Sequence, residues 1–483
     1  MGNLLLNRPE YANDVAEEIR LFLGFVTLTV NAPEDGADWT MRLTLTHTGA
    51  AYRVEGSLDG EAYAAAFTVE GDAPLLRKKH EKRQLKLAAY TLLKRRYPAV
   101  ETPWGSLTGI RPTKLFRELS REDGARAAAE TFRTVFDVSP AKTRLAETIC
   151  AVQRETVASA DERDLDVYIG IPFCRTRCLY CSFLSELVRD GALLATYLTV
   201  LEKDIFDGAA MMRQAGKRLR TVYFGGGTPT VLTAGQLDRL LSVTAAAYGS
   251  LGMECTVEAG RPDTIDEEKL RVLHSHGVGR ISVNPQTMND DTLRRVGRTH
   301  TAADIERAFC TARDVGFSAI NMDFIAGLPG EGVEEMARSM AAAERLRPDN
   351  LTVHALAVKR SSLLKKEMDV YPLPDAETAA RMIDLGAETA ARLGMQPYYM
   401  YRQKYMRGNL ENVGYAMPGK VCVYNIDMME ETVSILSHGA GAMTKRVFPG
   451  ENRIERLPAP KDVPTYLGKL EAILQKKRDL FLT

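Results

Sequence analysis

From residue 167 onward, short apolar stretches alternate with longer amphipathic ones. The short stretches have the length and apolar content of buried strands, and the longer ones repeat apolar residues at helical spacing. This alternation predicts an α/β fold in which parallel strands are joined by helices through right-handed crossovers. Strands are expected at 167–173, 221–224, 254–259, 280–283, 319–325 and 351–357, and helices near 191–215, 234–248, 266–276, 289–297, 302–315 and 332–346.

The periodicity leaves open whether this sheet stays open or closes into a barrel. In both cases the chemistry is expected at the C-terminal ends of the strands, because those ends meet on one side of the sheet. After a helix near 375–393, the chain reads as irregular until a last helix near 463–478.

The first 160 residues follow a different pattern. Residues 41–47 and 51–57 predict a β-hairpin, and 63–70 a third strand. A helix expected at 76–97 carries many Lys and Arg residues, which suit either a solvated helix face or a surface that binds RNA or another anion. We therefore expect an N-terminal α+β domain with this basic helix at 1–160, an α/β core at 161–365, and a helical and irregular C-terminal region at 366–483.

Composition narrows the class of protein. The chain has 483 residues, of which 45% are hydrophobic and 26% charged, as in a folded globular protein. Its 63 basic and 63 acidic residues cancel, so no overall charge attracts nucleic acid, and an anion site must be a local cluster. The sequence shows no apolar run of about 18 residues that could span a membrane. The absence of a secretory signal and an odd number of cysteines lead us to expect a cytoplasmic protein.

Three of the seven cysteines are crowded after the first core strand. Cys174, Cys178 and Cys181 have the spacing C-x3-C-x2-C. Three thiolates from one loop can hold a four-iron cluster and leave one iron open, whereas structural zinc normally requires four protein ligands. No further His or Cys occurs between Ser182 and Cys255. The motif therefore favours a 4Fe–4S cluster over zinc.

This motif, with Tyr180 before its last Cys, resembles that of the radical S-adenosylmethionine (SAM) superfamily. The second core strand ends in Gly225-Gly-Gly-Thr-Pro-Thr230, which resembles the superfamily segment that holds the amino group of SAM. Gly-Gly-Gly-Thr-Pro is similar in particular to the oxygen-independent coproporphyrinogen III oxidases. The resemblance implies a partial (β/α)6 barrel, with an N-terminal α+β domain and a C-terminal extension, that binds a 4Fe–4S cluster and SAM.

Further residues at the expected strand ends resemble the superfamily's cofactor site. Tyr168 lies where relatives place a Tyr beside SAM, Glu258 resembles a ribose-binding Glu, and Asp323 lies in a D-F-I-x-G-L-P signature. Each also has a structural interpretation; Glu258, for example, could pair with Arg261. The resemblance implies that the cluster is held by Cys174, Cys178 and Cys181, and SAM by Tyr168, Tyr180, Gly226, Gly227, Thr228, Glu258, Gln286, Arg298, Asp323 and Ala357.

Two segments outside these motifs, 103–114 and 398–416, resemble the HemZ type of coproporphyrinogen dehydrogenase. One departure concerns the position two residues beyond Cys181, where the best-characterised branch has a further Cys and this chain has Phe183. Some relatives without that Cys are haem chaperones. A haem-binding chaperone on the same barrel, or a radical SAM enzyme that acts on RNA or another substrate, therefore stays an alternative.

The resemblance implies oxidative decarboxylation of coproporphyrinogen III to protoporphyrinogen IX in haem biosynthesis. In the family, a 5′-deoxyadenosyl radical removes a hydrogen from a propionate side chain, and loss of CO2 and one electron leaves a vinyl group. An electron donor such as a flavodoxin or ferredoxin is implied, and no catalytic residue beyond the cluster ligands.

The substrate carries four carboxylates, but this chain is neutral overall. Cationic groups must therefore be concentrated at the pocket. We expect the segment 398–416 to close over the substrate and its propionates to bind Arg402, Lys404 and Arg407, with Arg402 favoured because arginine binds carboxylates in a bidentate way.

Overall fold

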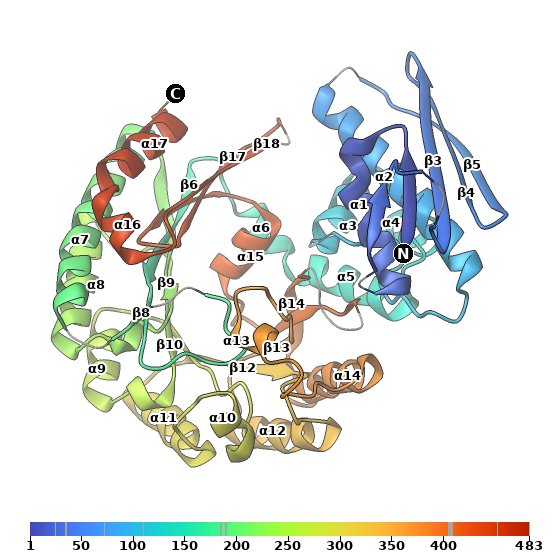
Figure 1. Ribbon diagram of the computed structural model, residues 1–483. Coiled ribbons are helices and arrows are strands. Elements are labelled where there is room, and N and C mark those ends of the chain that lie inside the picture. The colour runs from blue at the N-terminus through green and yellow to red at the C-terminus, as the bar shows by residue number, and fades with distance from the viewer. Residues whose placement is uncertain are drawn as a thin grey trace. The chain divides into compact units, whose positions relative to one another are not determined.

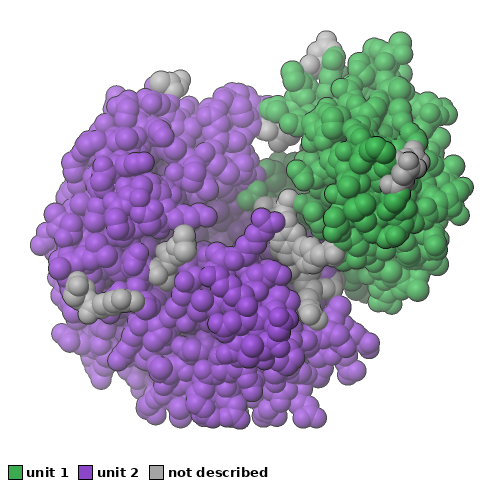
Figure 2. Space-filling view, in the orientation of Figure 1, with its two compact units in different colours: residues 1–147 green, residues 148–483 purple. Residues whose placement is uncertain are grey.

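The computed structural model describes residues 1–483 except 25, 34–35, 72, 110, 184–185, 189–190, 404–408, 452 and 483. The chain divides into two compact units, Met1–Glu147 and Thr148–Thr483 (Figure 2). The expected boundary at 160 falls inside the second unit. Just beyond that position, Asp164 is buried and accepts a hydrogen bond from Arg220 at 3.3 Å.

The first unit contains a five-stranded sheet in the order β2-β1-β3-β4-β5. The expected hairpin is confirmed, with Thr48 opposite Ala51 in an antiparallel pair. Two strands near the N-terminus were not predicted, and they pair in parallel through residues far apart in the sequence. The strands are β1 (Gly2–Leu6), β2 (Leu28–Val30), β3 (Trp39–Thr48), β4 (Ala51–Leu58) and β5 (Glu61–Thr68).

The basic helix is α2 (Pro74–Arg96), and its apolar residues pack with α1 (Ala12–Leu23) and the sheet in one buried core. Several of its cations are paired within the unit. Lys79 lies 2.8 Å from Glu118, and Lys86 lies 3.2 Å from the buried Glu18. These pairs favour a structural role for the helix over an open anion-binding surface. Further helices are α3 (Pro112–Asp123), α4 (Ala125–Thr134), α5 (Pro140–Val152), which crosses the division, and α6 (Arg154–Ala158).

The second unit is built on an eleven-stranded sheet in the order β14-β15-β13-β12-β11-β10-β9-β6-β16-β17-β18. The six expected strands form its parallel centre and confirm the partial (β/α)6 barrel. Helices follow one another along the outside of the curved sheet (Figure 1). The central strands are β6 (Asp164–Ile171), β9 (Arg218–Gly226), β10 (Glu254–Gly260), β11 (Arg280–Val283), β12 (Ala319–Ala326) and β13 (Asn350–Ala355). The helices are α7 (Gly191–Gln214), α8 (Ala234–Tyr248), α9 (Glu267–Ser275), α10 (Asp290–Arg295), α11 (Ala302–Val315), α12 (Val333–Leu346), α13 (Leu363–Lys366) and α14 (Ala376–Arg392).

The expectation that the C-terminal region is mostly irregular was wrong. Its strand β16 pairs in parallel with β6 and so extends the central sheet, and β15 pairs antiparallel with β13 at the other side. These partners are distant along the chain, so local periodicity carries little sign of them. The elements are β14 (Gln396–Tyr401), β15 (Asn412–Ala416), α15 (Val423–Glu430), β16 (Ser434–His438), β17 (Met443–Phe448), β18 (Arg453–Pro458), α16 (Val463–Gly468) and α17 (Leu470–Leu482).

Among the helices of the described residues, none combines the length and the apolar character that crossing a bilayer requires.

Candidate active site

The C-terminal ends of the central strands surround a cavity of about 500 Å3. This volume lies within the usual range for small-molecule sites. Every residue that the sequence assigned to the cluster or to SAM lines this one cavity. They are Tyr168, Cys174, Cys178, Tyr180, Cys181, Gly226, Gly227, Thr228, Glu258, Gln286, Arg298, Asp323 and Ala357.

The three cysteines reach the cavity from one loop. Cys174 ends the short strand β7 (Phe173–Cys174), which pairs with β8 (Glu186–Leu187). The Cys181 amide donates to the carbonyl of Cys178 at 3.1 Å, and both residues line the cavity. No three His, Cys, Asp or Glu side chains of the described residues converge on a single metal-ion position. Three thiolates from one loop would instead suit a four-iron cluster.

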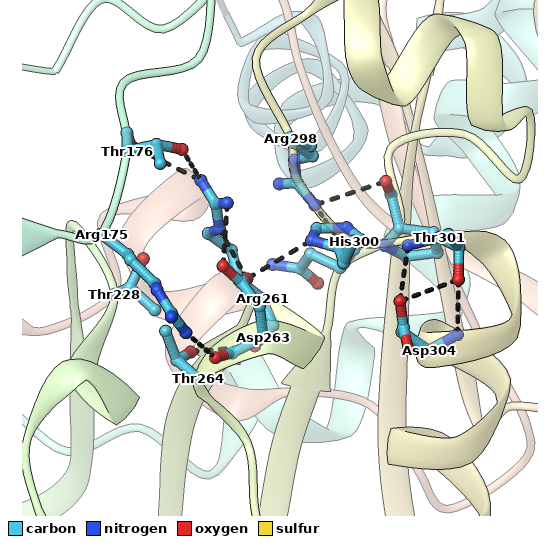
Figure 3. A network of polar contacts seen from close by, with 12 residues as sticks. Arg175, Thr176, Thr228, Arg261, Asp263, Thr264, Arg298, His300, Thr301 and Asp304 are labelled. Atoms are coloured by element: carbon cyan, nitrogen blue, oxygen red, sulfur yellow. Dashed lines mark hydrogen bonds and ion pairs between the residues drawn. The ribbon is translucent and has the colours of Figure 1, made fainter.

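A polar network holds in place the loop 174–181, which carries the three cysteines and is called the cluster loop (Figure 3). The guanidinium of Arg261 donates to Thr176 Oγ1 at 2.5 Å and to both carboxylate oxygens of Asp263 at 2.9 and 3.1 Å. His300 Nδ1 lies 3.3 Å from Asp263, and Arg175 donates to the Asp263 carbonyl at 2.7 Å. Burial alone raises the pKa of Asp263, but His300 and Arg261 lower it overall. The loop that carries Arg261 and Asp263, with His300 bonded to Asp263, therefore fixes the chain at Arg175 and Thr176.

Arg298 contributes a buried positive charge beside the cluster loop. Its guanidinium donates to the Asn284 carbonyl at 2.6 Å. Although burial lowers it, the pKa of Arg298 is raised overall by Tyr180 and Cys178. The guanidinium therefore stays charged and can stabilise a thiolate at Cys178.

The glycine turn after β9 allows close contact between backbone segments. The amides of Gly227 and Thr228 donate to the carbonyls of Ile171 and Phe173, each at 2.8 Å. A Cβ atom on Gly227 would lie 2.4 Å from the Phe173 oxygen and 2.9 Å from Cys174 Sγ. Glycine at 227 is therefore needed to bring this turn against Cys174.

Buried acceptors lie on the central strands. Glu258 accepts hydrogen bonds from the Tyr223 hydroxyl and, at 2.9 Å, from Asn284 Nδ2. Burial, and then the nearby Asp323 carboxylate, raise the pKa of Glu258 to about 7. Its suggested pairing with Arg261 is not what the structure shows, because Arg261 bonds Asp263.

Asn284 offers an independent sign of a ligand. Its Oδ1 atom is buried, and none of the described residues donates a hydrogen bond to it. A buried acceptor without a partner costs free energy unless a ligand or water satisfies it. Since Asn284 lines the cavity beside Glu258, these two side chains fit the hydroxyl and amino groups of an adenosine. The three cysteines, the glycine turn and these acceptors together fit a 4Fe–4S cluster with SAM.

Gln286 and Ala357 lie in the loops that follow β11 and β13. Gln286 follows the end of β11 and reaches β12 through hydrogen bonds of 2.8 Å to the Asp323 carbonyl and 2.9 Å from the Ile325 amide. Its φ of 68° is in the left-handed region. Ala357 lies two residues beyond β13, in the loop that continues over the cavity.

Aromatic rings form another part of the cavity wall. Tyr168 and Tyr223 line the cavity with ring centroids 6.2 Å apart, and both stack on Tyr424, which is not among the described lining residues, at 6.3 and 4.5 Å. Tyr398, Tyr399 and Tyr401 of β14 also line the cavity, on a segment that the sequence assigned to substrate binding.

None of the three cationic residues predicted to bind the substrate is among the described residues that line the cavity. Arg402 is buried, donates to the carbonyl of Asn409 at 3.2 Å, and is not among the described residues that line the cavity. Lys404 and Arg407 lie outside the described residues. Their binding to propionates stays a prediction.

Other residues of the cavity were missed in the sequence. Asn284 lies just beyond β11 and His354 is the last residue but one of β13, so polar residues near strand ends were the signal for both. Cys422 gave no such signal, because it reaches the cavity from the start of α15. Lys359 lies four residues beyond β13, at a position for which the sequence predicted no function.

Comparisons with known proteins identify relatives of this chain. Residues 168–343 match the model of the radical SAM superfamily. The chain is 34% identical to the oxygen-independent coproporphyrinogen-III oxidase-like protein HemZ of Bacillus subtilis, over 98% of this chain and 95% of that protein. It is 33% identical to the heme chaperone HemW of Bacillus subtilis, over 48% of this chain and 61% of that one. The solved coproporphyrinogen III oxidase HemN of Escherichia coli shares the fold, with a TM-score of 0.53 and 22% identity over 66% of this chain and 71% of that one.

Proposed function

This chain belongs to the radical SAM family of oxygen-independent coproporphyrinogen-III oxidase-like proteins, and we propose that it decarboxylates coproporphyrinogen III to protoporphyrinogen IX. The observation that carries the proposal is a single cavity lined by cluster cysteines, a glycine turn, buried acceptors and stacked tyrosines. When bound, the cluster and SAM supply the 5′-deoxyadenosyl radical that abstracts hydrogen from the substrate.

In this proposal the protein's own groups bind and orient the cluster and SAM. Cys174, Cys178 and Cys181 hold three irons of the cluster, and Arg298 stabilises the thiolate of Cys178. Glu258 and Asn284 accept hydrogen bonds from the adenosine part of SAM. The barrel and the cluster loop exclude bulk water from the reacting groups.

The tyrosine-lined part of the cavity is assigned to the tetrapyrrole. Strand β14 contributes Tyr398, Tyr399 and Tyr401 to the cavity. It is an edge strand of the sheet and is separated by several strands from β6 and β9, which carry Tyr168 and Gly226. Flat aromatic rings with a polar hydroxyl suit a ligand that is apolar at its centre and hydrophilic at its edge. No general acid or base is needed, because the departing group is CO2.

A second candidate function is haem binding without chemistry. It is favoured by the similarity to the heme chaperone HemW and by Phe183, which is 68% exposed beside the cluster loop where the oxidase branch has a Cys. The similarity to the HemZ-like protein covers 98% of this chain, whereas that to HemW covers 48% of it, so we place decarboxylation first.

The test is anaerobic turnover by the reconstituted full-length chain. The protein is incubated with coproporphyrinogen III, SAM and either dithionite or a reduced flavodoxin or ferredoxin. Products with one and then two vinyl groups, together with 5′-deoxyadenosine, are expected by mass spectrometry. Stable haem binding with SAM cleavage but without vinyl products would instead support the chaperone.

A further inference from the structure

A tetracarboxylate substrate needs cations that the protein has not already neutralised. Arg261, Arg280 and Arg298 line the cavity, but each is at most 6% exposed. All three are occupied by protein acceptors. Arg261 bonds Asp263, Arg280 donates to the Val421 carbonyl at 2.8 Å and lies 3.5 Å from Glu254, and Arg298 donates to the Asn284 carbonyl.

Lys359 differs from these arginines. It lines the cavity from the loop after β13 and keeps its exposure to solvent. Within the described parts of the chain, its ammonium has neither an ion pair nor a hydrogen bond. Desolvation by the surrounding protein nevertheless lowers the pKa of Lys359, with no acidic neighbour to offset it. A bound carboxylate would supply the missing counter-charge.

The loop that carries Lys359 is attached to the cluster loop. Arg177 Nη2 donates to the Ser361 carbonyl at 2.9 Å, and Ser361 Oγ donates to the Ser182 carbonyl at 3.1 Å. The Leu364 amide donates to the Leu179 carbonyl at 2.9 Å. These bonds hold Lys359 at the mouth of the cavity. Arg177 is exposed there as well, and it lines the same cavity.

We propose that Lys359 binds a propionate carboxylate of the porphyrinogen at the cavity mouth, with Arg177 as a second positive charge. This inference rests on the proposed function. A cavity of about 500 Å3 must hold SAM as well as part of a tetrapyrrole, so the outer carboxylates of the substrate project toward the mouth. At the mouth, Lys359 neutralises a substrate carboxylate that is not reacting. This contact fixes which propionate side chain of the substrate faces the radical.

The experiment compares Lys359→Ala with Lys366→Ala in the reconstituted full-length protein. Lys366, in α13 on the same loop, is exposed and is not among the described residues that line the cavity. Both variants lose one positive charge, but only Lys359→Ala loses it at the cavity. KM for coproporphyrinogen III is measured with saturating SAM and dithionite. Binding of coproporphyrin III and of its tetramethyl ester is titrated in parallel.

We expect Lys359→Ala to raise KM and the coproporphyrin Kd about tenfold, as for the loss of one charge-assisted contact. Lys359→Arg should restore most of the affinity, and Lys366→Ala should match the wild type. Binding of the ester should not respond to Lys359→Ala, because the ester has no carboxylate. SAM cleavage without substrate should be unchanged.

Wild-type turnover with an unaltered KM in Lys359→Ala would overturn this inference and leave the proposed function intact. A loss confined to flavodoxin-supported turnover, with normal KM, would assign Lys359 to the electron donor and also overturn it. If the wild-type protein did not bind coproporphyrin III at all, both the proposed function and this inference would be wrong.

Discussion

The glycine turn gives a sharp test of how the cluster ligand is positioned. Substitution Gly227→Ala would place a Cβ atom 2.4 Å from the Phe173 carbonyl oxygen, where ordinary contacts begin at 3.4 Å. The two groups must separate by about 1 Å, and both belong to a backbone that is hydrogen-bonded on either side. Overpacking of this kind costs about 1–3 kcal/mol.

Part of this strain should weaken binding of the cluster. The same Cβ atom would lie 2.9 Å from Cys174 Sγ, so relief of the clash displaces a cluster ligand. If the whole cost fell on cluster binding, the affinity would fall roughly 5- to 150-fold. We expect reconstituted Gly227→Ala to contain less iron and sulfide than the wild type and to show a weakened EPR signal after reduction.

Gly235→Ala is the matched control. Gly235 lies in α8, and a Cβ atom there would meet no other atom within 4 Å. This variant should keep full iron content and gain slightly in stability, by about 0.5–1 kcal/mol, because alanine favours a helix. Normal iron content, EPR signal and unfolding free energy in Gly227→Ala would refute the reasoning.

Further predictions concern the cluster, the acceptors and the core. Cys178→Ala should abolish the 4Fe–4S absorption, whereas Cys310→Ala, at an exposed cysteine, should retain it; a stable four-iron cluster in Cys178→Ala would contradict the ligand assignment. Because burial and Asp323 raise the pKa of Glu258 to about 7, protonation should weaken this acceptor as the pH falls. The Kd for SAM, titrated calorimetrically, should therefore rise below about pH 7 by up to roughly tenfold per unit, and Glu258→Gln should flatten this dependence. Asp204→Ala should lower the unfolding free energy in urea by about 3–5 kcal/mol, because it leaves the buried Lys477, now 2.6 Å from Asp204, without its counter-ion. An unchanged urea midpoint would show that the pair contributes little.

Local pattern was sufficient for the parallel centre of the fold. The strand expected at 280–283 coincides with β11, and the strands expected at 254–259 and 319–325 each extend by one residue in the structure. Buried parallel strands carry apolar residues in a short run, and this signal does not depend on which strand lies next to which. The edges of the sheet lack it. β16 reads as an isolated short segment, and its pairing with β6 on one side and β17 on the other explains its burial.

The same division applies to the candidate site. The cysteine spacing, the three glycines and the acidic strand ends could be found in the sequence, because those residues lie on single loops or at ends that must meet. Arg402 was preferred for its chemistry, but the structure buries it against Asn409. Lys359 has no distinguishing sequence context, yet it reaches the cavity because its loop bonds to the cluster loop.

The sequence by itself therefore determined the α/β class, the strand order of the core along the chain and the cluster motif, since all three depend on spacing between near neighbours. Only the tertiary structure decided which charges are neutralised. Arg261 could have paired with Glu258 or with Asp263, and the loop geometry selects Asp263, which leaves Glu258 to Tyr223 and Asn284. The pKa of Glu258, and with it the expected pH dependence of SAM binding, follows from that choice, because burial and neighbouring charge act through space.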